Sequence, residues 1–331
     1  MTFRIGKNFH IIHMTDDVRE LNLWYYDVFA VRQFMPEGYM AAEKRDASLV
    51  LLGELCVEPL APAFRVDGWQ DMPLGRFYRE HGKRFHSLAW YVDDGMAELY
   101  ETLRQAKIEC RGIGGVRLGD SYVDGPVFTH PRDTMTQLEF IPAPHVPGGP
   151  AMLRDPRYEP GWRASWWADY HPLQIQKLSH VTISTFDLDQ ALGVYVDCLH
   201  GTFLHETENP ALNSRSMFVL LGEDLIIELA QPAGDGPLKA DMDRFRNGIY
   251  AVAFKVRSLD DARRHLERKG VKLSWSDEPV AFVTDPEATH GVVMGFTTWD
   301  VPGDPRPDWT ENPEVLPARL LSGSDAPASG T

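Results

Sequence analysis

The stretch HIIHMTDDVRELNLWYYDVF (10–29) recurs further along the chain as HVTISTFDLDQALGVYVDCL (180–199). The alignment places His10 over His180 and Asp17 over Asp187, an offset of 170 residues. Each copy begins with an apolar run typical of a strand, passes an Asp-containing boundary, and continues as an amphipathic helix. A fixed internal period is the signature of a repeated structural unit, so this repeat decides the fold.

Further pairs of segments extend the repeat over most of the chain. The first pair keeps Glu58 over Glu228 at the same offset, and it matches LVLLGELCVEPLAP (49–62) with FVLLGEDLIIELAQP (218–232) after one inserted residue. The other pairs are FHSLAWYVDDGMAELYETLRQAKIEC (85–110) with IYAVAFKVRSLDDARRHLERKGVKL (249–273), and VFTHPRDTMTQLEF (127–140) with FVTDPEATHGVVMGF (282–296). The chain therefore contains four units, and each is predicted to be a strand and a helix followed by several strands.

The length of 331 residues also favours two domains, because a single domain usually has about 100–200 residues. We expect one domain at 1–145 and a second at 173–302. Residues 146–172 are dense in Pro and Gly and are predicted to be a linker, which Trp162, Trp166 and Trp167 pack onto the domains. Residues 303–331 are predicted to be an extended or disordered tail.

Composition excludes several classes of protein. The formal net charge of −15 would repel phosphate backbones and anionic lipids, so neither nucleic acid nor a membrane is an expected partner. Three widely spaced cysteines fit neither a disulfide framework nor a Cys-based zinc site, and the N-terminus shows no signal-peptide pattern. We expect a cytoplasmic protein with a small-molecule substrate. The sequence leaves open whether the protein forms a homo-oligomer.

Four residues at equivalent positions of the first two units form a candidate metal site. His10 and His86 lie on the first strand of their units, and Glu58 and Glu139 lie on the last strand. If the two units pair about a pseudo-twofold axis, these strands meet and the two imidazoles and two carboxylates converge. Nitrogen and oxygen ligands without thiolate suit Fe(II), Mn, Co, Ni or Zn.

The segments HIIHMTDDV, FHSLAWYV and HPRDTMTQLEF resemble the vicinal oxygen chelate superfamily, which includes glyoxalases, methylmalonyl-CoA epimerases, bleomycin-resistance proteins and extradiol dioxygenases. The resemblance covers nearly all of residues 8–300. It implies an α+β fold of four βαβββ modules, arranged as two paired-module half-barrel domains. It also implies one divalent metal ion, bound by His10, Glu58, His86 and Glu139.

The second half of the chain keeps the repeat and loses two of the ligands. His86 corresponds to Tyr250 and Glu139 to Gly295, so only His180 and Glu228 remain. Tyrosine and glycine do not replace an imidazole and a carboxylate around a hard cation. We therefore expect the C-terminal domain to be a structural cover or a wall of the substrate pocket.

The predicted site suits proton transfer next to a carbonyl, as in an isomerase, epimerase or lyase, with the metal ion as Lewis acid. Glu58 and Glu139 are the candidate proton carriers. His130, in the loop before the last strand, is a further candidate whose alternative role is that of a turn residue. The same His10, His86 and Glu139 could instead form the 2-His-1-carboxylate triad of an Fe(II) extradiol-type dioxygenase. A ligand-binding protein without turnover is the third hypothesis.

Overall fold

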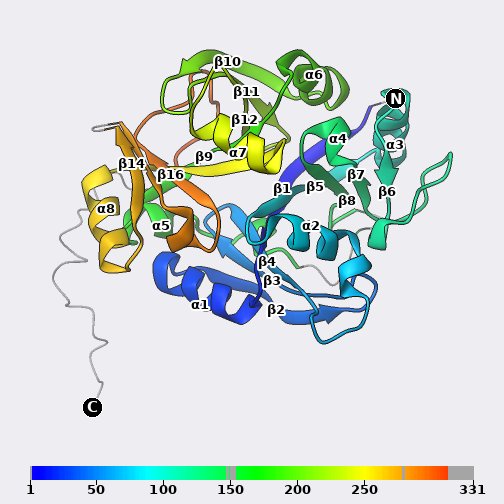
Figure 1. Cartoon of the computed structure of the whole chain (residues 1–331), viewed down its shortest axis with the longest axis horizontal. Coiled ribbons are helices and arrows are strands. Elements are labelled where there is room, and N and C mark those ends of the chain that lie inside the picture. Colours follow the sequence, from blue (N-terminus) through cyan, green and yellow to red (C-terminus); the bar gives the residue numbers. More distant parts are fainter. Residues whose placement is uncertain (1, 147–148, 150–153, 278–279, 312–331) are drawn as a thin grey trace.

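The computed structural model describes residues 2–146, 149, 154–277 and 280–311, and it contains two eight-stranded mixed sheets. The strand orders are β2-β3-β4-β1-β5-β8-β7-β6 and β10-β11-β12-β9-β13-β16-β15-β14, so the second sheet repeats the first. Figure 1 shows the two sheets with their helices, some at the edges of the molecule and others near its centre. The α+β fold of four modules in two paired domains, predicted from the repeat and the resemblance, is confirmed.

The N-terminal sheet and its helices occupy residues 4–142. Their bounds are β1 Arg4–Met14, α1 Val18–Phe29, β2 Arg32–Met40, β3 Arg45–Leu52, β4 Leu55–Pro62, η1 Trp69–Asp71, α2 Pro73–His81, β5 Phe85–Asp94, α3 Met96–Gln105, β6 Cys110–Arg111, η2 Ile113–Gly115, β7 Val127–Thr129, α4 Pro131–Thr134 and β8 Gln137–Pro142. Strand β1 is parallel to β4 and antiparallel to β5, which is parallel to β8. The two modules therefore meet at the β1–β5 pair.

The C-terminal sheet and the connecting segment follow the same plan. Their bounds are η3 Pro156–Tyr158, α5 Ser165–Asp169, β9 Ile175–Ser184, α6 Leu188–Leu192, η4 Gly193–Cys198, β10 Thr202–Asn209, β11 Ser214–Leu221, β12 Leu225–Pro232, α7 Pro237–Phe245, β13 Gly248–Val256, α8 Leu259–Arg268, β14 Leu273–Asp277, β15 Ala281–Thr284, η5 Pro286–Thr289 and β16 Val293–Thr297. Within the described residues, no helix is long and apolar enough to cross a membrane.

The repeated aspartates begin the repeated helices. Asp17 is the N-cap of α1, where its side chain accepts a hydrogen bond from the amide of Glu20 at 2.9 Å. Asp187 caps α6 in the same way and accepts from the amide of Gln190 at 3.0 Å. An N-cap of this kind satisfies an amide that the helix itself leaves unpaired. The sequence match between these aspartates therefore reflects one shared local structure.

The two halves pack on one another through a common core. A single cluster of buried apolar side chains contains residues of both sheets, from Ile5 and Trp90 to Phe254 and Phe296. Polar contacts also join the two halves. Figure 1 shows α1 of the first half and α8 of the second on the same side of the molecule. The imidazole of His265 on α8 contacts the carbonyl of Val28 on α1 at 2.8 Å. The halves thus hold a fixed relative position.

After each sheet, the chain returns to its first strand with an Asp-Pro-Arg motif. Arg157 has a fully buried side chain, which forms an ion pair with Asp155 and donates to the carbonyls of Asn8, Phe9 and Glu54. In the C-terminal half, Arg306 pairs with Asp304 and donates to the carbonyls of Ser179 and Asp224. Two of these carbonyls correspond at the 170-residue offset, Phe9 with Ser179 and Glu54 with Asp224. Each motif therefore contacts the strand that carries His10 or His180.

The predicted linker and tail both lie against the folded halves where they are described. Trp167 is buried and donates from Nε1 to the carbonyl of Phe29, and Trp162 donates to Glu54 Oε1, both at 2.9 Å. Trp166 is 42% exposed. In the tail, Trp309 packs on the core. Residues 147–148, 150–153 and 312–331 of these two predicted segments lie outside the described residues.

Candidate functional site

Strand register brings three of the four predicted ligands to one place. His10 on β1 pairs with Ala89 on β5, and Ala89 pairs with Glu139 on β8, so the three residues form one row across the sheet. Glu58 on β4 pairs with Ile12, two residues after His10. Residues two apart on a strand point to the same face. His10, Glu58 and Glu139 therefore converge on one side of the N-terminal sheet.

The three side chains approach one another in pairs around the His10 imidazole. Nε2 of His10 lies 3.1 Å from Oε2 of Glu58 and 3.4 Å from Oε2 of Glu139. The side chains of His10 and Glu58 are each 5% exposed. Both ring nitrogens of His10 and Oε2 of Glu58 are buried without a hydrogen-bond partner in the described structure. Buried polar atoms normally have such partners, so the lack of partners at these three atoms needs an explanation.

A divalent cation is the group that these atoms fit. Around an ion bound at about 2.1 Å, neighbouring ligand atoms stand about 3.0–3.4 Å apart, which is the spacing seen on either side of His10. A neutral imidazole nitrogen and two carboxylate oxygens are also a suitable donor set. As they stand, however, no three His, Cys, Asp or Glu side chains in the described residues meet closely enough to form a complete metal site.

An arginine that the sequence analysis did not select lies beside this cluster. Nη1 of Arg45 on β3 donates to Oε1 of Glu58 at 2.6 Å, and its Nε donates to Glu43 at 2.7 Å. Burial opposes the charge of Arg45, but the carboxylates of Glu58 and Glu43 outweigh burial and raise its pKa. Arg45 therefore stays charged and fixes one oxygen of Glu58, while the other oxygen faces His10.

His86 lies in the same cleft but does not contact the His10 cluster. Its Nδ1 is 2.9 Å from the hydroxyl of Ser87, and its ring packs edge-on against Phe77 of α2, with 4.4 Å between the ring centres. Burial, with smaller contributions from His81 and Arg45, lowers the pKa of His86 to about 3. The imidazole is therefore neutral near pH 7 and able to accept a hydrogen bond or a ligand.

The cleft itself has a volume of about 340 Å³. Its lining includes Glu58, His86 and Glu139 together with His130 and Arg45. Nδ1 of His130 accepts a hydrogen bond from the amide of Arg132 at 3.2 Å, so His130 is the N-cap of α4. His130 therefore has the structural role of a turn residue that the sequence analysis gave as the alternative. His130 also lines the cleft.

At the equivalent position in the C-terminal half, both oxygens of the glutamate, Glu228, accept hydrogen bonds. Nε2 of His180 lies 3.4 Å from Oε2 of Glu228, which also accepts from the hydroxyl of Thr182 at 2.6 Å. The other carboxylate oxygen accepts from Asn209 at 3.1 Å. Burial would raise the pKa of Glu228, but the hydrogen bonds and charge of His180 and the hydroxyl of Thr182 lower it to about 2. Unlike Glu58, Glu228 has hydrogen-bond partners on both oxygens.

The comparisons with known proteins agree with this fold. Residues 177–288 match the family model of the Glyoxalase/Bleomycin resistance protein/Dioxygenase superfamily. The matched residues lie within the C-terminal half of the chain. The resemblance stated from the sequence is confirmed, and the glyoxalase-type architecture extends to the N-terminal sheet, which has the same strand order. No match was found among curated proteins.

One solved structure shows the same architecture over most of the chain. A mutant of 4-hydroxymandelate synthase from Streptomyces coelicolor superposes with a TM-score of 0.63 at 14% identity, and covers 88% of this chain and 92% of that chain. At this level of identity the likeness shows that the two chains share a fold. Methylmalonyl-CoA epimerase from Mycobacterium tuberculosis aligns at 26% identity over 37% of this chain and 87% of its own, with a TM-score of 0.35.

Proposed function

We propose that the N-terminal half binds one divalent metal ion through His10, Glu58 and Glu139, and catalyses proton transfer next to a carbonyl of a small oxygen-chelating substrate. The observation that supports this proposal is the His10 imidazole, which is buried without a hydrogen-bond partner in the described structure, with Oε2 of Glu58 3.1 Å and Oε2 of Glu139 3.4 Å from its Nε2. His86, the fourth predicted ligand, lines the same cleft. Fe, Mn, Co, Ni and Zn all suit these donors.

Bound there, the ion would act as a Lewis acid that stabilises negative charge on the oxygens of the substrate. The two carboxylates have different roles in this proposal. Glu58 is held by Arg45 and is the fixed ligand. Apart from its contact with His10, the side chain of Glu139 makes no hydrogen bond or ion pair in the described part of the chain and is 12% exposed, so we assign the proton transfer to it. A general base must reach the proton that it abstracts, and a mobile carboxylate at the cleft meets that need.

The position of His86 favours proton transfer over the dioxygenase alternative. An Fe(II) dioxygenase site built on His10, His86 and Glu139 would require both imidazoles at one ion. His86 instead contacts Ser87 and Phe77, while Glu58 takes the place beside His10. The dioxygenase and the non-catalytic ligand-binding protein remain the alternatives that the following experiment separates.

The first test is the metal content of the whole chain, purified without oxygen and measured by elemental analysis. The wild-type protein is expected to carry one divalent ion, and Glu139→Gln and Glu58→Gln are expected to lose most of it because an amide oxygen carries no charge to balance the cation. The matched control is Glu228→Gln, which changes the equivalent buried residue of the other half and is expected to keep the ion. Equal metal content in all four proteins would refute the proposed site.

The second measurement is oxygen uptake with a panel of catechols. Metal-loaded protein is expected to show no substrate-dependent uptake, because the proposed reaction moves a proton and no electrons. Bound iron together with substrate-dependent uptake would overturn the proton-transfer proposal and support the dioxygenase. Absence of metal from the wild-type protein would leave the ligand-binding alternative.

A further inference from the structure

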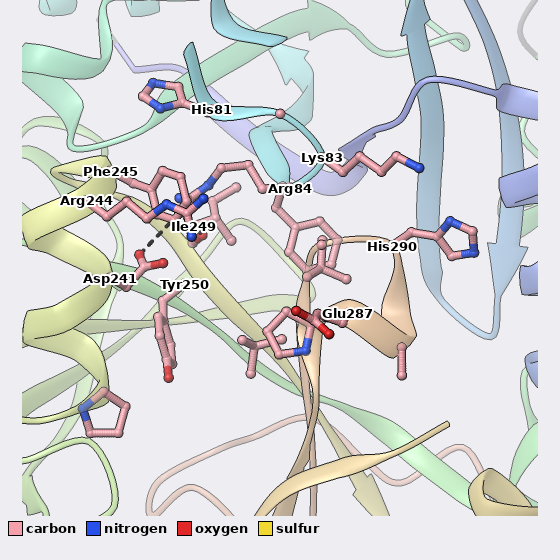
Figure 2. Close-up of a pocket in the computed structure, with 18 of the residues that line it drawn as sticks. His81, Lys83, Arg84, Asp241, Arg244, Phe245, Ile249, Tyr250, Glu287 and His290 are labelled. Carbon is pink, nitrogen blue, oxygen red and sulfur yellow. Dashed lines mark hydrogen bonds and ion pairs between the residues drawn. The ribbon is translucent and has the colours of Figure 1, made fainter. Parts of the chain in front are cut away.

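A second and larger cavity, of about 880 Å³, lies between the two halves. Figure 2 shows its walls: the segment from His81 to Arg84 that joins α2 to β5, the end of α7, the start of β13, and the segment that carries Glu287 and His290. The halves touch closely here. Gly291 has a φ of 90°, and a Cβ at that position would lie 2.1 Å from the carbonyl oxygen of Lys83. Any side chain at position 291 would therefore collide with the backbone of Lys83.

Arg84 is a buried cation of this cavity with too few partners. Its side chain is 9% exposed, and its Nη1 is buried without a hydrogen-bond partner in the described structure. Its Nη2 makes two long contacts of 3.3 Å, to Oδ2 of Asp241 and to the carbonyl of Ile249. A guanidinium group carries five N–H donors, and a buried charge is costly unless it is well paired.

Arg157 shows how this chain satisfies a buried guanidinium elsewhere. Its side chain is fully buried, and it donates to three backbone carbonyls at 2.7–2.9 Å in addition to its ion pair with Asp155. Arg84, almost as buried, has a single long ion pair. The difference marks Arg84 as a residue with hydrogen-bonding capacity left for a ligand.

A second arginine lies beside the first. The guanidinium carbon of Arg84 is 4.0 Å from the centre of the Phe245 ring, and that of Arg244 is 4.6 Å from the same ring. Figure 2 shows the two guanidinium groups together beside Phe245, with Asp241 as the nearby carboxylate. Arg244 is exposed and makes no hydrogen bond or ion pair within the described residues. Asp241 is the carboxylate that pairs with Arg84, and Glu20, Glu287 and Lys83 also line the cavity.

We propose that the cavity between the halves binds an organic anion. Its carboxylate or phosphate accepts hydrogen bonds from Arg84 and Arg244, and its apolar body packs against Phe245, Ile249 and Val292, which also line the cavity. Charge-assisted hydrogen bonds to a guanidinium fork are strong and directional, which makes arginine pairs effective at binding such groups. His81 lines both cavities, but this site contains none of the proposed metal ligands and goes beyond the proposed function.

The test uses phenyl phosphate and phenylacetate as probes, titrated into the full-length protein by isothermal calorimetry at low ionic strength. We expect at least one of them to bind, and phenol, which has the same ring without the charge, not to bind. The tighter of the two anions identifies a phosphate or a carboxylate as the preferred group. Arg84→Met is expected to weaken binding about tenfold or more, since hydrogen bonds to charged groups contribute about 1.5–3 kcal/mol.

Arg244→Gln gives a second variant that does not disturb the core, because Arg244 is exposed. It is also expected to weaken binding severalfold. The matched control is Lys239→Gln, which removes the same charge from the same helix, α7, at a residue that does not line the cavity. The proposal is overturned if neither anion binds, if phenol binds as tightly, or if Lys239→Gln weakens binding as much as Arg244→Gln.

Discussion

Arg157→Met is expected to lower the free energy of unfolding by about 3–5 kcal/mol, the range seen when one partner of a buried ion pair is removed. The substitution leaves Asp155 as an uncompensated buried charge. It also leaves the carbonyls of Asn8, Phe9 and Glu54 without their donor. Since Asn8 and Phe9 directly precede His10, the same change should loosen the strand that carries the proposed metal ligand.

Urea unfolding, followed by tryptophan fluorescence and far-UV circular dichroism, measures this loss. Arg306→Met tests the corresponding motif of the other half and is expected to cost less, because the side chain of Arg306 is 11% exposed. Arg163→Met is the control on the connecting segment, where the side chain is 60% exposed and a change of about 0.5 kcal/mol at most is expected. A loss below about 1 kcal/mol for Arg157→Met would show that the ion pair and hydrogen bonds of Arg157 are not needed for stability.

Acid is expected to destabilise the protein well above the pH at which most carboxylates titrate. Burial lowers the pKa of His13, His86 and His171 to about 3 in each case, whereas an unfolded imidazole titrates near 6.5. Below pH 6.5 the unfolded chain therefore binds protons that the folded chain excludes. Each group removes about 1.4 kcal/mol of stability per pH unit until pH 3 is reached.

One buried carboxyl works in the opposite direction. Burial raises the pKa of Asp224 to about 6, so its folded form takes up a proton before the unfolded form does as the pH falls. Between pH 6 and 4, this proton uptake by the folded protein offsets the loss of stability caused by about one of the three imidazoles. The expected net loss is thus about 3 kcal/mol per pH unit in that window, which is a large part of the stability of an ordinary domain.

The pH dependence of the urea midpoint between pH 7 and 5 checks this prediction, and His13→Gln identifies its source. His13 is fully buried between the hydroxyl of Tyr25 and the carbonyl of His290, so its removal is expected to reduce the slope by about 1.4 kcal/mol per pH unit. His145→Gln is the control, because the His145 side chain is 51% exposed. A slope that is unchanged in His13→Gln would contradict the assignment.

The internal repeat was enough to predict the fold and the approximate place of the candidate site. Period-two alternation in the strands and the capping aspartates at 17 and 187 are local features, and they gave the correct order of elements. The predicted pairing of the first two modules places His10, Glu58 and Glu139 on one face, as the strand register shows. Whether these residues bind a metal ion stays a proposal.

The position of His86 depends on a detail that alternation does not show. The pairing of β1 with β5 has a register shift between Ile11 and His13, opposite the start of β5. His86 still lines the cleft with Glu139, but its ring lies against Phe77 and its Nδ1 against Ser87, away from the His10 contacts. A shift of one residue changes which side chains face the site, and a bulge of this kind has no clear sequence signal.

By itself, the sequence determined that this protein has four modules in two similar halves, and that only the first half retains both histidines and both glutamates, because these properties are set by local spacing and by residue identity. Only the tertiary structure showed the long-range contacts of the buried arginines. Arg45 reaches Glu58 across a strand pair, Arg157 reaches β1 from 148 residues away, and Arg84 meets Asp241 only where the halves touch. Such contacts depend on how distant segments pack, and no local pattern in the chain encodes them.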